Sequence, residues 1–263
     1  VKRMRLTKQR RAAIVREVMA NQIVRVSELS AKFGVSEVSI RRDLAKLEEQ
    51  GLLRRIRGGA VRVSIEFLLQ PFGERMRLRA REKEEIGHMA ASLIESGDRI
   101  ILDSGTTVLQ VAKHIPQTAI ETGELTIITA SFPAFCELAR YEQIQLLILG
   151  GIYLFDYQTL VGPQTVANLQ GLHVDKLFLG ADGLTFSKGL TTANILEAEV
   201  TRAMVNAAAR VIVVTDSSKI GKVGFTTIIP LTEISTLVTD SNAPADFVEA
   251  LRQEGVEVIL VQT

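Results

Sequence analysis

Five consecutive residues near the middle of the chain carry groups that could bind an anion. They directly follow an apolar run and are, in order, Asp103, Ser104, Gly105, Thr106 and Thr107. Gly105 allows the backbone to turn, and the Ser and Thr side chains supply hydroxyl groups. The start of a following helix would add unpaired N–H groups and a positive dipole end. The segment therefore predicts a phosphate site, with a simple helix cap as the alternative.

Other glycines and charged residues follow further apolar runs. Gly150 and Gly151 would allow a ligand to approach the backbone closely. Lys219 could neutralise a phosphate group. Asp182 could accept hydrogen bonds from sugar hydroxyls, or it could simply be a turn residue. Together with the first segment, these residues indicate a site for a phosphorylated sugar if the fold brings them to one place.

The apolar runs that precede these residues predict the strands of one sheet. We expect strands near Ile100, Leu125 to Thr129, Leu146 to Leu149, Lys176 to Leu179, Val211 to Val214, Leu237 to Val238 and Val256 to Val261. Continuous apolar strands that alternate with helical stretches are typical of an α/β fold, with a mainly parallel sheet covered on both faces. In such a sheet ligands bind beyond the carboxyl ends of the strands. The candidate site residues are expected at that edge.

The charges are divided unevenly between the two parts of the chain. Residues 1–63 hold 16 Lys or Arg against 6 Asp or Glu, a net charge of +10, whereas the remainder holds 15 against 24, a net charge of −9. The overall charge of +1 conceals this division. A basic small domain attached to an acidic larger one predicts that the small domain binds a polyanion.

Three helices are expected in the basic part. Thr7 can cap a first helix that runs to about Ala20, and Ser27 can cap a short second helix that ends at Gly34. Ser36 can cap a third helix that continues through Gln50. Its apolar stripe consists of Ile40, Leu44 and Leu47, and its other face carries Val38, Ser39, Arg42 and Lys46, with Arg41 on the flank. This pattern predicts a helix-turn-helix whose second helix enters the major groove of DNA.

A short hairpin is expected after the third helix. Gly58 and Gly59 lie between two β-type stretches, and Arg54 and Arg57 would place positive charge beside a phosphate backbone. This is the pattern of a wing. The alternative is a three-helix protein-interaction module whose arginines are only solvated.

The division of the chain follows from these patterns. We expect a winged helix-turn-helix over residues 1–63, a linker over 64–82 and an effector domain over 83–263. The linker would contain a packed element around Phe67, Leu68 and Phe72.

Several classes of protein are disfavoured. No apolar run approaches the roughly 18 residues that a membrane helix needs. Cys136 is the single cysteine, so neither an intrachain disulfide nor a zinc-finger site is expected. His88, His114 and His173 lack the spacing of metal ligands. We expect a cytoplasmic protein with no metal and no cofactor.

The basic domain resembles a known family. The segments 35–44, 47–51 and 54–60 resemble the signature of the DeoR family of bacterial repressors, and the effector-domain segments 103–107, 180–183, 189–192, 197–198 and 216–219 resemble its sensor domain. The resemblance implies that residues 36–44 form the recognition helix and 57–59 the wing tip. It also implies a homo-oligomer that binds operator DNA and responds to a phosphorylated sugar. The stretches 210–219 and 255–261 look closest to repressors of amino-sugar and hexitol operons.

The sensor domain of this family is similar to ribose-5-phosphate isomerase, which raises an enzymatic alternative. Asp182, Lys188 and Glu197 match an aspartate, the lysine and the glutamate of the isomerase site, and they are added to the expected effector site. A further isomerase aspartate falls at Leu179 in this chain. Because that carboxylate is lost, we expect a receptor and not an enzyme. The alternative is a sugar-phosphate isomerase with an attached DNA-binding domain.

Overall fold

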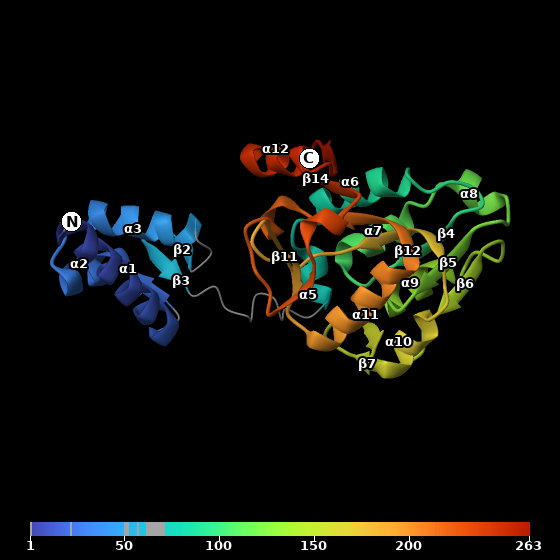
Figure 1. Ribbon diagram of the computed structural model, residues 1–263, viewed down its shortest axis with the longest axis horizontal. Coiled ribbons are helices and arrows are strands. Elements are labelled where there is room, and N and C mark those ends of the chain that lie inside the picture. Colours follow the sequence, from blue (N-terminus) through green and yellow to red (C-terminus); the bar gives the residue numbers. More distant parts are fainter. Residues whose placement is uncertain (1, 22, 50–52, 57, 62–71) are drawn as a thin grey trace. The chain divides into compact units, whose positions relative to one another are not determined.

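A computed structural model describes residues 2–21, 23–49, 53–56, 58–61 and 72–263. The chain divides into two compact units, Val1–Leu68 and Leu69–Thr263, and each is described by itself (Figure 1). The predicted linker, 64–82, crosses this division. Residues 64–71, including Phe67 and Leu68, lie outside the described residues, whereas 72–82 contain helical segments of the second unit. Within the described residues, no helix is long and apolar enough to cross a membrane.

The described residues of the first unit form three helices and a small sheet. Its elements are α1 (Lys2–Asn21), β1 (Ile23–Arg25), α2 (Val26–Phe33), α3 (Glu37–Glu49), β2 (Arg54–Ile56) and β3 (Gly59–Val61). The strands pair antiparallel in the order β1-β3-β2. The apolar stripe of α3 is buried, since Ile40, Leu44 and Leu47 are at most 2% exposed. The predicted helix-turn-helix and its hairpin are therefore present.

Two predicted helix starts in this unit are wrong. Helix α1 begins at Lys2, so Thr7 lies within the helix and does not cap it. Helix α2 begins at Val26, and its cap is Arg25, whose N–H donates to a Glu28 carboxylate oxygen at 3.3 Å. Ser27 therefore lies inside the first turn. The predicted end at Gly34 is confirmed, because this residue has the left-handed φ of 61° that favours glycine.

A buried ion pair fixes α3 against α1. Asp43 is 2% exposed, and its carboxylate receives Arg10 Nη2 at 2.6 Å and Arg11 Nε at 2.8 Å. Both arginines come from α1, and they neutralise a charge that would be costly to bury alone. The position of α3 is thus set by this contact as well as by the apolar stripe.

The second unit is built on a seven-stranded parallel sheet. Its strands are β4 (Arg99–Leu102), β5 (Thr126–Thr129), β6 (Gln145–Ile148), β9 (Val174–Leu179), β12 (Ala208–Val214), β14 (Thr236–Asp240) and β15 (Glu257–Val261). Their order is β15-β14-β12-β9-β4-β5-β6, and every neighbouring pair is parallel. The α/β fold class and all seven predicted strands are confirmed.

Helices cover both faces of this sheet. They are α5 (Phe72–Arg77), α6 (Ala80–Ala91), α7 (Thr106–Lys113), α8 (Gln117–Glu121), α9 (Phe132–Leu138), α10 (Pro163–Leu169), α11 (Ile195–Ala207) and α12 (Ala245–Gln253). The sheet residues Ile100 and Phe178 pack with α6, α7 and α9 in one core. Their neighbours Ile101 and Leu177 pack with α10, α11 and α12 in the other. This alternation explains why the strands contain runs of consecutive apolar residues.

Shorter elements surround the sheet. They are the hairpin β7 (Ile152–Leu154) and β8 (Thr159–Val161), the antiparallel strands β10 (Gly183–Thr185), β11 (Gly189–Thr192) and β13 (Thr226–Ile229), and the 3-10 turns η1 (Ser217–Lys219) and η2 (Leu231–Glu233).

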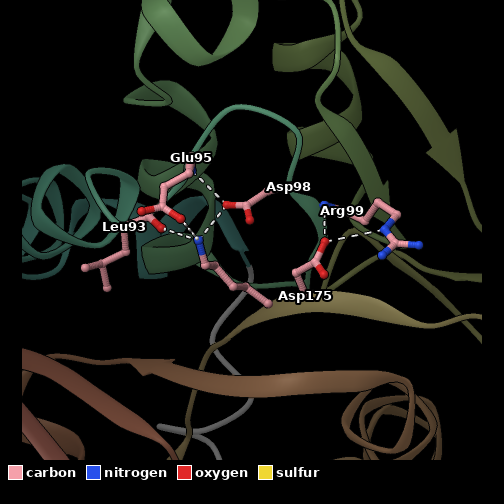
Figure 2. Close-up of polar contacts among 6 residues, drawn as sticks. Leu93, Glu95, Asp98, Arg99 and Asp175 are labelled. Carbon is pink, nitrogen blue, oxygen red and sulfur yellow. Dashed lines mark hydrogen bonds and ion pairs between the residues drawn. The ribbon is translucent and has the colours of Figure 1, made fainter.

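A buried lysine ties two strands together at the amino end of the sheet. Lys176 of β9 is 6% exposed, and its Nζ donates to Asp98 Oδ2 at 2.6 Å and to the Leu93 carbonyl at 2.9 Å. Figure 2 shows this network beside the exposed pair of Arg99 and Asp175. Because Asp98 immediately precedes β4, the pair joins β4 to β9 at the end opposite the candidate site.

Candidate functional site

The strand order reverses between β4 and β9. From β4 the chain adds β5 and β6 on one side, and it then returns to place β9 on the other side of β4. Such a switch point separates the loops that follow the two strands and is where parallel sheets bind ligands. The two loops carry Asp103 and Asp182. The Asp103 N–H donates to the Phe178 carbonyl at 3.0 Å, which holds the first loop against β9.

The N-terminus of α7 opens at this switch point. Gly105 precedes the helix with φ 116° and ψ 158°, and no described side chain caps it. A Cβ atom at Gly105 would meet nothing within 4 Å, whereas Thr106 and Thr107 are buried. Free helical N–H groups, the dipole end and neighbouring hydroxyls are the features that bind a phosphate. The segment that the sequence singled out therefore lies at a helix start that no described side chain caps.

Three acidic side chains gather beside this helix end. Thr192 Oγ1 lies 3.0 Å from Asp182 Oδ2 and 3.1 Å from Glu197 Oε2, and the Ala193 N–H donates to Asp182 at 3.2 Å. Ser104 Oγ donates to Glu197 Oε1 at 3.2 Å. A hydroxyl has one hydrogen, so Thr192 can donate to only one of its two acidic neighbours. If both contacts are hydrogen bonds, Thr192 accepts one of them from a protonated carboxyl group.

The surroundings favour the neutral form of two of these acids. Burial raises the pKa of Asp103 to about 7, and the charge of Asp182 adds to this effect. Burial also raises the pKa of Glu197 well above its ordinary value, with further contributions from the charges of Asp182 and Asp103. Neutral carboxyl groups can donate hydrogen bonds as well as accept them. The cluster can therefore bind hydroxyl or carbonyl oxygens.

Three basic residues at four-residue intervals lie over the same edge of the sheet. Arg75 Nη1 lies 3.8 Å from Asp182 Oδ1, and Arg79 Nε lies 3.5 Å from Asp216 Oδ1. Lys83 Nζ donates to the Arg75 carbonyl, and burial lowers the pKa of this amine to about 8. None of the three was expected at the site, because they fall in or just after the predicted linker. Their regular four-residue spacing is the sequence pattern that could have indicated a shared helix face.

An aromatic residue also joins the site. The ring centroid of Tyr157, in the loop between β7 and β8, lies 5.0 Å from Arg75 Cζ. The Phe72 N–H donates to the Asp156 carbonyl at 3.0 Å, which ties α5 to this loop. A single tyrosine in a hairpin loop carries no sequence signal for this position.

The other predicted effector residues have contacts elsewhere in the second unit. Gly151 packs closely against other residues of the protein, since a Cβ atom there would lie 2.6 Å from the Val161 carbonyl oxygen. The Gly150 carbonyl accepts a hydrogen bond from the Thr165 hydroxyl at 2.8 Å. Lys188 is exposed in the turn between β10 and β11, where its carbonyl accepts from Thr227. Lys219 ends η1, close enough to Lys83 for its charge to lower that pKa.

The predicted recognition helix presents its basic residues to solvent. Ser36 Oγ accepts from the Ser39 N–H at 3.4 Å, which confirms the predicted cap. Arg41 is exposed and pairs with Glu37 at 2.7 Å. Arg42 is also exposed, and no ion pair joins it to another described residue. Further along the helix, Lys46 is exposed too, and Val38 is 62% exposed.

The predicted wing is a tight hairpin. Strands β2 and β3 pair with Ile56 opposite Gly59, and Gly58 is exposed at the tip with φ 84°. A Cβ at Gly59 would lie 2.1 Å from Val24 O, so only glycine fits against β1 there. Arg54 lies in β2, and Arg57 lies outside the described residues.

Two family models match the chain, one for each unit. A DeoR-like helix-turn-helix domain matches residues 10–66, and a DeoR C terminal sensor domain matches residues 78–241. The chain belongs to the DeoR family. This membership agrees with the winged helix-turn-helix and with the parallel sheet.

Relatives of this DeoR-family protein match over nearly their full lengths. A protein of Escherichia coli O157:H7, named as an aga operon transcriptional repressor, is 39% identical over 99% of this chain and 96% of its own. The HTH-type transcriptional repressor GlcR of Bacillus subtilis strain 168 is 34% identical over 97% of this chain and 96% of its own. Among solved structures, ribose 5-phosphate isomerase A from Methanocaldococcus jannaschii is 21% identical, with a TM-score of 0.38, over 60% of this chain and 55% of its own.

These relatives decide between regulator and isomerase. Since the full-length relatives are named as transcriptional regulators, this DeoR-family protein is a regulator and not an enzyme. Leu179, where the resemblance places an isomerase aspartate, is fully buried at the end of β9 and packs in the sheet core.

Proposed function

We propose that the protein represses a sugar-catabolic operon and releases its operator when a phosphorylated sugar binds at the switch point. The observation that carries this proposal is the uncapped N-terminus of α7 beside the cluster of Asp103, Asp182 and Glu197. The helix N-terminus suits a phosphate group and the acidic cluster suits hydroxyl groups, so a single ligand that carries both kinds of group can span them. The names of the aga operon and GlcR relatives support a role in sugar metabolism.

The phosphate group would occupy the start of α7. The N–H groups of Thr106 and Thr107 and the nearby hydroxyls supply donors, and the helix dipole favours negative charge. Lys219 and Lys83 add positive charge at the neighbouring strand end. The sugar hydroxyls would meet Asp182 and Glu197, which can accept and, where protonated, donate hydrogen bonds.

The DNA-binding unit would place α3 in the major groove of double-stranded operator DNA. Ser39, Arg42 and Lys46 lie on the exposed side of this helix and would meet base edges or phosphates, while Gly58 would bring the wing to the backbone. Readers of this type bind paired half-sites as symmetric oligomers, so we propose a homo-oligomer. A cytoplasmic location follows from the DNA target.

Effector binding would change the operator affinity through the segment that joins the two units. A ligand shifts an equilibrium only if it binds the two states with different affinity. Arg75, in the first described helix after that segment, contacts Asp182 of the ligand site. A ligand that competes for Asp182 would therefore act on α5 directly.

A binding screen tests this function. Thermal melting would be followed with pentose, hexose and amino-sugar phosphates, each paired with its unphosphorylated sugar. The proposal expects at least one phosphorylated member to raise the melting temperature while its free sugar does not. If no phosphorylated sugar shifts the transition, the effector assignment fails.

A further inference from the structure

The hydroxyl of Tyr157 is buried without a partner. The residue is 6% exposed, and within the described part of the chain its hydroxyl oxygen makes no hydrogen bond. By contrast, the hydroxyl of Tyr141 accepts from Arg140 Nη2 at 2.9 Å. Buried polar groups in folded proteins are nearly always hydrogen-bonded. If Tyr157 served only to fill space, phenylalanine would serve better.

The backbone holds Tyr157 in place. The next residue, Gln158, adopts φ 52°, an uncommon conformation for a residue other than glycine. Two hydrogen bonds fix the turn: the Gln158 N–H donates to the Phe155 carbonyl at 3.3 Å, and the Phe132 N–H donates to the Gln158 carbonyl at 2.9 Å. The position of the phenol is therefore set by the loop and not by a hydrogen bond of its own.

The neighbours of Tyr157 belong to the candidate site. Its ring lies under the guanidinium of Arg75, which in turn approaches Asp182. Arg75 Nε is a second buried donor that has no partner in the described structure. Burial raises the pKa of the Tyr157 phenol, and the charges of Glu197 and Asp182 raise it further. The phenol thus stays protonated and lies within the electrostatic reach of both acids.

We propose that Tyr157 is a specificity-determining residue of the effector site, and that its O–H group hydrogen-bonds a hydroxyl or carbonyl oxygen on the carbon chain of a sugar phosphate. The neighbouring Arg75 Nε contacts the same end of the ligand. This inference rests on the proposed function, since it is the phosphate at α7 that directs the carbon chain toward Asp182 and Glu197. Two buried donors that lack partners in the unliganded protein then gain them on binding.

The test uses Tyr157→Phe in the full-length protein, with Tyr153→Phe as the matched control because Tyr153 is 44% exposed. Calorimetric titrations would use inorganic phosphate and four sugar or polyol phosphates: galactose 6-phosphate, fructose 6-phosphate, ribose 5-phosphate and glycerol 3-phosphate. Tyr157→Phe is expected to weaken the tightest of these four roughly 3- to 10-fold, the range for one hydrogen bond. Inorganic phosphate affinity and operator affinity should stay unchanged. The melting temperature without ligand should stay the same or rise, because the variant no longer buries an unpaired hydroxyl. Tyr153→Phe should change none of them.

The contrary outcomes separate this proposal from the one it rests on. If wild-type protein binds a sugar phosphate and Tyr157→Phe binds it equally well, the role of Tyr157 is overturned and the effector site stands. If Tyr157→Phe loses inorganic phosphate affinity in equal measure, the hydroxyl lies beside the phosphate and the proposal is again wrong. If neither inorganic phosphate nor any of the four ligands binds the wild-type protein, both proposals fail.

Discussion

Ser104 Oγ lies 3.2 Å from Glu197 Oε1, so the loop before α7 is joined to the first turn of α11 across 93 positions of the sequence. In the proposed effector site, this bond connects the end that would bind the phosphate to the end that would meet the sugar hydroxyls. A ligand that spans both ends must share or replace it. The protonation of the buried acids around this bond therefore affects both stability and binding.

Asp103→Asn tests the protonation of this cluster. Burial raises the Asp103 pKa from 3.8 to about 7, so the folded protein keeps a proton that the unfolded chain loses above about pH 4. The contribution of this group to wild-type stability is therefore complete below pH 4 and is lost as the pH rises to about 7. Asparagine does not titrate. The unfolding free energy of the variant, relative to wild type, should rise by up to about 1.4 kcal/mol per pH unit over this range.

Urea unfolding at pH 4, 5, 6, 7 and 8 measures this difference. Glu142→Gln is the control, because Glu142 is exposed and its replacement should change the unfolding free energy by less than about 0.5 kcal/mol. A difference for Asp103→Asn that stays constant between pH 4 and 7 would show that the carboxyl group is ionised throughout.

Asp98→Ala tests the buried pair at the amino end of the sheet. It removes the nearer and buried carboxylate partner of Lys176 and leaves the ammonium with the Leu93 carbonyl and the largely exposed Glu95, at 3.4 Å. Breaking a buried pair costs about 3–5 kcal/mol, and Glu95 should keep the loss toward the lower end of this range. Asp175→Ala breaks the neighbouring exposed pair with Arg99 and should cost less than about 1 kcal/mol. Chemical denaturation measures both (Figure 2). Equal losses would contradict the distinction between buried and exposed pairs.

Arg42→Ala tests the recognition helix. If this exposed arginine reads a guanine, its loss should weaken specific operator binding by about 1–3 kcal/mol and leave binding to random DNA nearly unchanged. Arg41→Ala is the comparison, because Arg41 already pairs with Glu37 and should contribute less. Fluorescence anisotropy on both DNAs is the measurement. An equal loss on random DNA would assign Arg42 to a phosphate contact.

Gly105→Ala tests the backbone at the start of α7. Its φ of 116° is strained for any residue with a Cβ atom, so the variant should lose about 1–3 kcal/mol of stability and bind inorganic phosphate more weakly. Gly73→Ala is the matched control: this helical glycine has open space around it, and alanine there should gain up to about 1 kcal/mol. Phosphate binding unchanged in Gly105→Ala would argue against the α7 site.

The sheet was predictable from sequence for a physical reason. Parallel strands covered on both faces contain consecutive apolar residues, and runs such as those around Ile101 and Val213 stand out from the amphipathic helices between them. The strand-end rule also predicts that Asp103 and Asp182 lie at one edge of the sheet. Helix starts were less predictable, because Thr7 and Ser27 have capping side chains but lie inside longer helices.

The missed site residues come from contacts that no local pattern reveals. Arg75 and Lys83 belong to two helices separated at Arg79, whose φ of 49° interrupts the helical period and made the segment resemble a linker. Tyr157 reaches the site from a hairpin loop far along the chain. A glycine permits the close approach of either a ligand or a protein group, and the sequence does not distinguish the two. At Gly151 the structure places Thr165 close to the backbone.

Operator release by a phosphorylated sugar is the most direct test of the whole account. An operator would be selected from random duplexes with the wild-type protein, and its affinity would then be measured by anisotropy with each phosphorylated sugar and its unphosphorylated counterpart. We predict that at least one phosphorylated sugar weakens operator binding by about 5- to 150-fold, the usual range of allosteric coupling, while its free sugar has no effect. Operator affinity that no phosphorylated sugar changes would contradict the account.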